Sequence, residues 1–301
     1  MARNLNAFRR AAIAPAAHTA PHTVPMHSRP PIVLSFAASD PTGGAGLQAD
    51  LLTIASLGCH PASVLTALTA QDTRGVEALV AVEHGWVERQ ARCVLADLPV
   101  AAFKIGVLGS VANAAVIASI LAEHPQAPVV LDPVLASGRG DAFASAELMA
   151  AMRGALFART TVLTPNSLEA RRLAAAEGGE APALEECARR LLALGCKHVL
   201  ITGTHEPGAQ VVNTLYGARG MLSQDRWPRL PGSYHGSGCT LAAAIAALLA
   251  RGMELEPAVR EAQAYTWQAL SAAFQAGRGQ ALPNRFPRSP EPQGARRSGA
   301  R

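Results

Sequence analysis

Short apolar, β-branched runs alternate along the chain with longer stretches in which apolar residues recur at helical spacing. The short runs predict strands at residues 31–37, 62–68, 101–107, 127–134, 160–166, 198–203 and 211–217. The longer stretches predict helices at residues 46–58, 87–98, 111–124, 145–158, 184–195 and 240–250. Such alternation indicates βαβ units around a mostly parallel sheet, which is an α/β fold. In such sheets ligands lie at the carboxyl ends of the strands, so the loops after the strands should carry the chemistry.

The net charge of +5 is carried by the two ends of the chain. Residues 1–31 hold four arginines and no acid, and residues 286–301 hold four arginines and one glutamate, which leaves −2 for residues 32–285. We expect a disordered tail at 1–30, one folded domain at 31–285 and a disordered basic tail at 286–301. The first tail also has the acid-free character of a transit peptide, although translation from Met26 is the plainer reading.

The composition excludes several classes of function. A slightly acidic folded part with 4% aromatic residues does not favour a nucleic-acid partner. No apolar run reaches the roughly 18 residues of a membrane span, and the N-terminus lacks the core of a secretory signal. The five cysteines are odd in number and none is spaced as CxxC, so neither a zinc site nor a disulfide framework is expected. We therefore predict a cytoplasmic protein.

Two loops after the first strands carry polar side chains suited to a small ligand. "SDPTGGAGLQAD" follows the first strand, and its glycines let backbone approach a ligand before Asp50 arrives on the next helix. Gln71 follows the second strand and can both donate to and accept from an aminopyrimidine edge. The alternatives are a tight turn with a solvated Asp50, and a glutamine that only serves its loop.

Two later strand ends carry acids. Asp132 ends the strand in "VVLDPVL". A carboxylate at a strand end suits Mg²⁺, which binds oxygen ligands. The alternative is an aspartate that caps the next turn. Asn166 and Glu169 in "LTPNSLEA" stand at the next strand end and in the first turn of a helix. Ordinary helix capping explains this second pair equally well.

The stretch "HGSGC" precedes the apolar helix at 240–250. Backbone amides at Gly236, Ser237 and Gly238 can converge there into an anion hole that the helix dipole reinforces. Cys239 lies in the first turn, where a thiolate is favoured and can take a proton from a hydroxyl that attacks a phosphoryl group. The alternative is a small residue buried under a helix, which we expect for Cys59, Cys93, Cys187 and Cys196.

Taken together these blocks resemble the hydroxymethylpyrimidine/phosphomethylpyrimidine kinases of thiamine biosynthesis. The likeness covers about residues 31–285 and rests on "SDPTGGAGLQADLLTIASLG", "TAQDTRGV", "FKIGVLGS", "VVLDPVLASGRGD", "LTPNSLEA" and "GSYHGSGCTLAAAIAALLARG", in that order. It implies a ribokinase-like three-layer α/β/α fold with a small flap over the substrate. It also implies an ATP-dependent kinase of 4-amino-5-hydroxymethyl-2-methylpyrimidine and of its monophosphate, working with Mg²⁺ as a homodimer.

The resemblance assigns roles to individual positions. Gln71 matches the residue that binds the aminopyrimidine, Asp50 the carboxylate at the hydroxymethyl side, and Ala45, Val107 and Val134 the lining of the pocket. Asp132 and Glu169 match the acids that organise Mg²⁺, and Asn166, Glu169 and Thr202 lie on the ATP side. Gly236, Ser237 and Gly238 match the anion hole, and Cys239 matches the catalytic base.

Three positions depart from the family pattern, and two other functions stay open. Ala38 stands where glycine is usual, Ser237 replaces a common threonine, and Thr202 occupies the position of a lysine that faces the ATP phosphates in many members. Arg139 is a candidate substitute for that lysine. A pyridoxal kinase of the same fold is one alternative, and a catalytically weak pyrimidine-binding sensor is the other.

Overall fold

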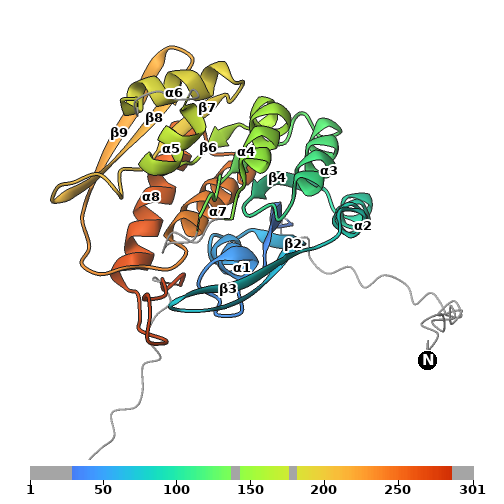
Figure 1. The fold of residues 1–301 in the computed structure, drawn as a ribbon, viewed down its shortest axis with the longest axis horizontal. Coiled ribbons are helices and arrows are strands. Elements are labelled where there is room, and N and C mark those ends of the chain that lie inside the picture. Colours follow the sequence, from blue (N-terminus) through green and yellow to red (C-terminus); the bar gives the residue numbers. More distant parts are fainter. Residues whose placement is uncertain (1–28, 137–142, 176–181, 287–301) are drawn as a thin grey trace, which may run out of the picture.

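The computed structural model describes residues 29–136, 143–175 and 182–286, so the expected tails at 1–30 and 286–301 lie almost wholly outside it. Its strands form one nine-stranded sheet in the order β3-β2-β1-β4-β5-β6-β7-β8-β9 (Figure 1). The strands are β1 (Ile32–Ala38), β2 (His60–Asp72), β3 (Gly75–Ala81), β4 (Val100–Ile105), β5 (Val129–Leu131), β6 (Val162–Leu163), β7 (His198–Ile201), β8 (Gln210–Gly217) and β9 (Gly220–Pro228). β2, β1, β4, β5, β6 and β7 pair in parallel, whereas β3, β8 and β9 pair antiparallel.

Helices cover both faces of this sheet and give the three-layer fold that the sequence predicts. They are α1 (Gly46–Ser56), α2 (His84–Asp97), α3 (Val111–Ala122), α4 (Ala146–Ala151), α5 (Ser167–Ala174), α6 (Leu184–Ala193), α7 (Ser237–Ala250) and α8 (Leu255–Ser271). Strand residues alternate between two buried clusters: Leu34 and Leu131 pack with α2 to α6, and Val33 and Val130 pack with α1, α7 and α8. None of the helices in the described ranges has both the length and the apolar character needed to cross a bilayer.

The structure corrects several of the predicted elements. The predicted strand at 160–166 shortens to Val162–Leu163, and the predicted helix at 145–158 is α-helical only to Ala151, continuing as a π-helix (Met152–Leu156) and a 3₁₀ turn (Phe157–Arg159). β3, β9 and α8 were not predicted. Cys59, Cys187 and Cys196 are buried as expected, but Cys93 is exposed, so the prediction for Cys93 is wrong.

The hairpin of β2 and β3 extends past the carboxyl edge of its neighbour. β1 ends at Ala38 opposite Ala67, while β2 continues to Asp72 and there pairs with β3 alone. The flap that the resemblance implies stays a prediction, with this projecting hairpin as its candidate.

Candidate active site

The N-terminus of α7 forms a bare backbone cradle. Its N-cap residue, Gly236, has φ = 78° and provides no side-chain cap, so the amides of the first turn lack the partners that a capping side chain supplies. A Cβ at Gly236 would lie 1.9 Å from the carbonyl oxygen of Gly44, which only glycine avoids. Free amides and the positive end of the helix dipole together favour an anion such as a phosphate.

Beneath the cradle, adjacent strands carry a row of polar side chains on the face that α1 and α7 cover. Ser35 of β1 is opposite Lys104 of β4, and Asp132 follows β5 on the same face. Asp50 reaches this row from α1: its Oδ2 accepts from Ser35 Oγ at 2.6 Å and from Lys104 Nζ at 2.9 Å. Ser35, Asp50 and Lys104 are all 0% exposed, so the ion pair is fully internal.

The charge of Lys104 is maintained by its acidic surroundings. Burial alone would lower the pKa of this amine, but Asp50, Cys239 and Asp132 outweigh that effect and raise it above its ordinary value. Asp50 had been predicted to meet the hydroxymethyl side of the substrate. The structure instead gives its carboxylate an internal partner, so that role stays a prediction.

Asp132 and Glu169 form a buried acidic pair in which both pKa values are raised. Burial raises the pKa of Asp132 to about 6, with Lys104 opposing and Asp50 adding to the rise. Burial and the neighbouring Asp132 raise the pKa of Glu169 to about 8. Within the described part of the chain, Asp132 Oδ2 is buried without a hydrogen-bond partner. A Cβ at Gly238 would lie 3.7 Å from that oxygen, so the acid faces the cradle directly.

Two crowded carboxyls with an unpartnered oxygen fit a divalent cation, which would relieve their repulsion. The described residues contain no group of three or more metal-ligating side chains. The two acids alone would therefore need waters or phosphate oxygens to complete a magnesium shell, which is how Mg²⁺ usually binds beside phosphates.

Cys239 lies in the first turn of α7 and is partly exposed. Burial of its sulfur raises the pKa of the thiol to about 12, with Lys104 opposing the rise and Asp132 and Asp50 adding to it. This direction runs against the predicted preference for a thiolate, because burial of the sulfur and the charges of Asp132 and Asp50 favour the neutral thiol.

Asn166, Glu169 and Thr202 meet at the carboxyl ends of β6 and β7. Asn166 and Glu169 form a reciprocal capping box at the start of α5, which is the alternative that the sequence left open. Thr202 forms a bridge with Asn166 and its carbonyl accepts from the amide of Ser167 at 3.0 Å. Arg139, the candidate substitute for the family lysine, lies outside the described residues.

The residues predicted to bind the pyrimidine come from two places. Ala45, Val107 and Val134 are partly exposed and follow β1, β4 and β5, which are neighbours in the sheet. Gln71 lies on the projecting hairpin, beside a bulge in the β2–β3 pairing, and lines an open surface pocket of about 520 Å³ with other hairpin residues.

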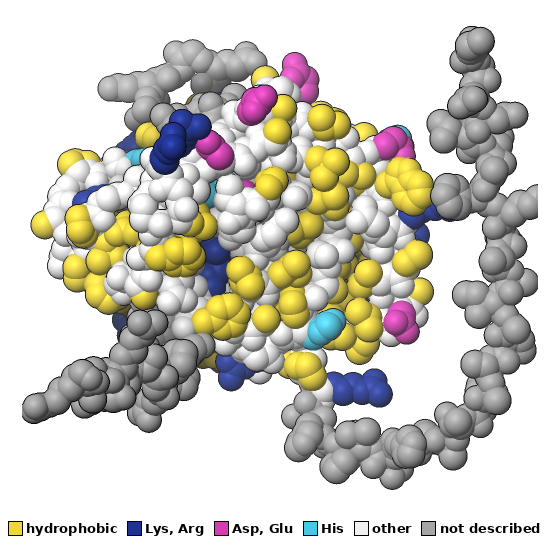
Figure 2. Space-filling view, turned by 90° about the horizontal axis from the view of Figure 1, so that it is seen from below, with side chains coloured by type: hydrophobic (Ala, Val, Ile, Leu, Met, Phe, Trp, Pro, Cys, Tyr) yellow, Lys and Arg dark blue, Asp and Glu magenta, His cyan; other side chains and the backbone are white. Residues whose placement is uncertain are grey.

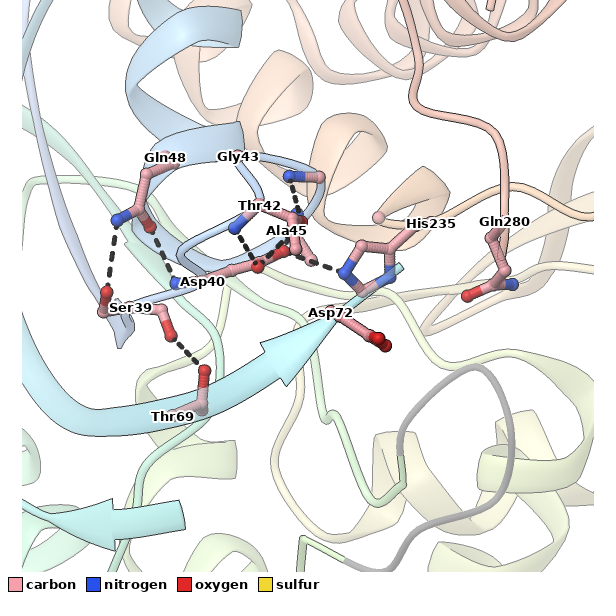
Figure 3. Close-up of polar contacts among 12 residues, drawn as sticks. Ser39, Asp40, Thr42, Gly43, Ala45, Gln48, Thr69, Asp72, His235 and Gln280 are labelled. Atoms are coloured by element: carbon pink, nitrogen blue, oxygen red, sulfur yellow. Dashed lines mark hydrogen bonds and ion pairs between the residues drawn. The ribbon is translucent and has the colours of Figure 1, made fainter. Parts of the chain in front are cut away.

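Sequence reasoning missed a polar network that fixes the loop after β1 (Figure 3). Asp40 is 1% exposed and accepts from the amides of Thr42 at 2.8 Å and Ala45 at 2.7 Å, and His235 Nε2 lies 2.8 Å from its Oδ2. Burial would raise the pKa of Asp40, but the hydrogen bonds from His235 and Thr42 hold it below its usual value. The glycine loop therefore packs against the cradle, and its amides form hydrogen bonds within the loop rather than facing a ligand.

Comparison with known proteins identifies the relatives of this chain. The family model for phosphomethylpyrimidine kinase matches residues 40–284. The chain belongs to the phosphomethylpyrimidine kinase family. A curated relative, the hydroxymethylpyrimidine/phosphomethylpyrimidine kinase of Streptomyces coelicolor, is 40% identical over 254 residues, covering 83% of this chain and 92% of the relative.

Two solved structures place the fold among vitamin kinases. A phosphomethylpyrimidine kinase from Clostridium difficile is 32% identical with a TM-score of 0.69, over 80% of this chain and 99% of that one. The pyridoxal kinase of Staphylococcus aureus, solved with pyridoxal, is 27% identical with a TM-score of 0.77, over 85% of this chain and 94% of that one. The predicted ribokinase-like fold and kinase family are thus confirmed, and membership of the family implies ATP as the co-substrate.

Proposed function

We propose that this protein phosphorylates 4-amino-5-hydroxymethyl-2-methylpyrimidine with ATP, and then phosphorylates the resulting monophosphate to the diphosphate, in thiamine biosynthesis. The observation that carries the proposal is the bare cradle of α7, which opens over Asp132 and Cys239 in a chain of this family. Phosphoryl transfer requires mainly positioning and neutralisation of charge, and the cradle offers both to a transferring phosphoryl group.

In this mechanism the first-turn amides at Gly236, Ser237 and Gly238 receive the phosphoryl oxygens. Cys239 faces the attacking hydroxyl from the same turn. It first gives its own proton to solvent and, as the thiolate, then accepts the hydroxyl proton. The transition state of phosphoryl transfer is loose, and the hydroxyl must still lose its proton as the new O–P bond forms, which a base within reach assists. Because burial raises the pKa of the Cys239 thiol to about 12, only the small thiolate fraction serves as the base near neutral pH.

Asp132 and Glu169 would hold Mg²⁺, which when bound supplies positive charge to the phosphates. Both acids must ionise to do so, and their raised pKa values mean that they give up protons near neutral pH. Asn166 and Thr202 border the nucleotide at the ends of β6 and β7. On the other side of the cradle, Ala45, Val107 and Val134 line the pyrimidine pocket and Gln71 pairs with the aminopyrimidine from the hairpin.

Pyridoxal kinase is the second candidate, because the TM-score to the pyridoxal kinase of Staphylococcus aureus exceeds that to the phosphomethylpyrimidine kinase. A coupled ADP-release assay with hydroxymethylpyrimidine, its monophosphate and pyridoxal separates the candidates. We expect both pyrimidines to turn over with a higher kcat/KM than pyridoxal. A preference for pyridoxal would reassign the enzyme. If none of the three compounds caused ADP release, a pyrimidine-binding sensor would be favoured.

The proposal includes a homodimer. Leu68 and Val80 are paired across the β2–β3 hairpin and are 53% and 64% exposed, and Figure 2 shows hydrophobic side chains spread over the face seen from below. A second copy would remove such surface from water. Light scattering at micromolar concentration tests it, and a monomer mass would reject it.

A further inference from the structure

The segment after α8 runs across three parts of the candidate active site. We call residues 273–285 the C-terminal strap. Its Gly279 and Gln280 amides donate to Thr73 at the tip of the β2–β3 hairpin, at 3.0 and 2.8 Å. Its Ala281 carbonyl accepts from the amide of His235, in the loop that leads into α7, at 3.0 Å. The strap therefore joins the hairpin to the loop that precedes the cradle.

The strap ends in Arg285, which is 3% exposed. Its Nη1 donates to the carbonyl of Gly43 at 3.0 Å and its Nη2 donates to the carbonyl of Gly44. Its Nε donates to Thr240 Oγ1 at 3.1 Å, and that hydroxyl donates to the carbonyl of Gly236 at 2.8 Å. One guanidinium thus holds the glycine loop after β1 and the first turn of α7 in a fixed relation.

These contacts act on the backbone that forms the cradle. Gly236 and Gly44 are in direct backbone contact, so a shift of the glycine loop would move the residue that sets the direction of the first-turn amides. The charge of Arg285 also acts there. An arginine side chain stays protonated in proteins, and no salt bridge to Arg285 is found among the described residues. Its buried positive charge interacts with Asp50 and Asp40 and adds to the dipole of α7 behind the anion.

We propose that Arg285 is a positioning residue for phosphoryl transfer, which locks the glycine loop to α7 so that the first-turn amides fit the transferring phosphoryl group better than they fit the ground-state phosphates. The inference rests on the proposed function only for the identity of the phosphoryl acceptor. The binding of an anion at the cradle does not depend on it. It concerns a residue that lies one position past the segment matched by the family model.

The variants separate the hydrogen-bonding geometry of the planar guanidinium from its positive charge. Arg285→Met removes both, Arg285→Lys keeps the charge without the planar fork, and Thr240→Val cuts only the link from Arg285 to Gly236. Arg251→Met is the matched control, because Arg251 follows the opposite end of α7 and donates to the carbonyl of Leu57 at 3.3 Å. For each protein we would measure kcat, the Kd of hydroxymethylpyrimidine, the Kd of MgADP, inhibition by MgADP with aluminium fluoride, and Tm.

A residue that aligns the cradle should affect the transition state far more than the ground state. We expect Arg285→Met to lower kcat and weaken inhibition by MgADP–aluminium fluoride by about a hundred-fold, since a misplacement of about 1 Å costs that much. The Kd values of MgADP and of hydroxymethylpyrimidine should change by less than about threefold, which a uniform loss of structure would not allow. Arg285→Lys and Thr240→Val should fall between Arg285→Met and the wild type, and Arg251→Met should match the wild type.

The proposal is overturned if Tm falls while kcat and fluoride inhibition stay within threefold of the wild type, or if all affinities weaken equally. If Arg285→Met does not fold, the same comparison is decided by Arg285→Lys and Thr240→Val. If the wild type does not phosphorylate the pyrimidines, the proposed function fails, while the difference between MgADP and MgADP–aluminium fluoride still supports or rejects the role of Arg285.

Discussion

The buried pair of Asp50 and Lys104 makes the sharpest prediction about stability. Both side chains are 0% exposed, with 2.9 Å between Nζ and Oδ2. Removing one partner of such a pair leaves an uncompensated buried charge and costs about 3–5 kcal/mol. At roughly 2–4 °C per kcal/mol for a domain of this size, Asp50→Asn or Lys104→Met should lower Tm by on the order of 10 °C.

A double-mutant cycle shows that the loss comes from the pair itself. Asp50→Asn combined with Lys104→Met removes both charges, so the two losses should not add, and the coupling free energy should be about 2–3 kcal/mol. Asp72→Asn is the control, because Asp72 pairs with Arg74 on the surface at 3.0 Å, where solvent screens the pair and little stability depends on it. Circular dichroism during heating and urea titration gives each value.

The same variants test the substrate role that the sequence assigned to Asp50. If Asp50→Asn left the free energy of unfolding within about 0.5 kcal/mol of the wild type and raised only the KM for the pyrimidine, the internal ion pair would not be its function. The reasoning from burial would then be refuted. A large loss of stability in Asp50→Asn, with little change in its KM for the pyrimidine, supports the internal role.

Three further predictions concern the substrate pocket, the acidic pair and the nucleotide side. Gln71→Leu should raise the KM for hydroxymethylpyrimidine about ten- to hundred-fold, because an unpaired polar edge costs ~1–3 kcal/mol, and an equal rise for ATP would remove Gln71 from the pyrimidine pocket. In the metal-free protein Glu169 keeps its proton up to about pH 8, whereas in the unfolded chain its pKa has the ordinary glutamate value of 4.5. Its contribution to stability therefore falls as pH rises between these values, and Glu169→Gln should flatten the fall in Tm from pH 5 to 8; an unchanged slope contradicts this. Thr202→Lys should lower the KM for ATP by about tenfold through a charge-assisted contact with phosphate, with Thr202→Val as the uncharged control, and a weaker ATP site would show that another cation already occupies the position.

Alternation of apolar runs was enough to predict the parallel part of the sheet, because strands buried on both faces read as continuous apolar segments. The edge strands of the sheet were harder to predict. β3 and β9 mix polar with apolar residues because each is paired on one side only, and Asp225 of β9 is buried only by virtue of its contacts with Arg260 and Gln263 of α8. Those partners are remote in sequence, so no local pattern around Asp225 predicts the contacts.

The candidate site divides in the same way. Asp132, Glu169 and the glycine turn before α7 stand at strand ends or a helix start, where fold rules alone direct attention. Lys104 gave no such signal, since a lysine within an apolar strand becomes meaningful only when Asp50 is placed against it. Arg285 joins residues about 240 positions away, and only the tertiary structure brings them together. The pKa of Cys239 was mispredicted because the helix start was visible in the sequence but the depth of burial was not.

The central claim is that the cradle of α7, with Cys239 in its first turn, transfers phosphate to the hydroxymethyl oxygen of the pyrimidine. The most direct measurement is ³¹P NMR of the products formed from hydroxymethylpyrimidine and MgATP by the wild type and by Cys239→Ala, with Cys93→Ala as an exposed-cysteine control. We predict a phosphate ester coupled to the methylene protons, followed by a diphosphate, with Cys93→Ala matching the wild type and Cys239→Ala at least about a hundred-fold slower but fully folded. ATP hydrolysis without a pyrimidine ester, or a Cys239→Ala enzyme within a few-fold of the wild-type rate, would contradict the account.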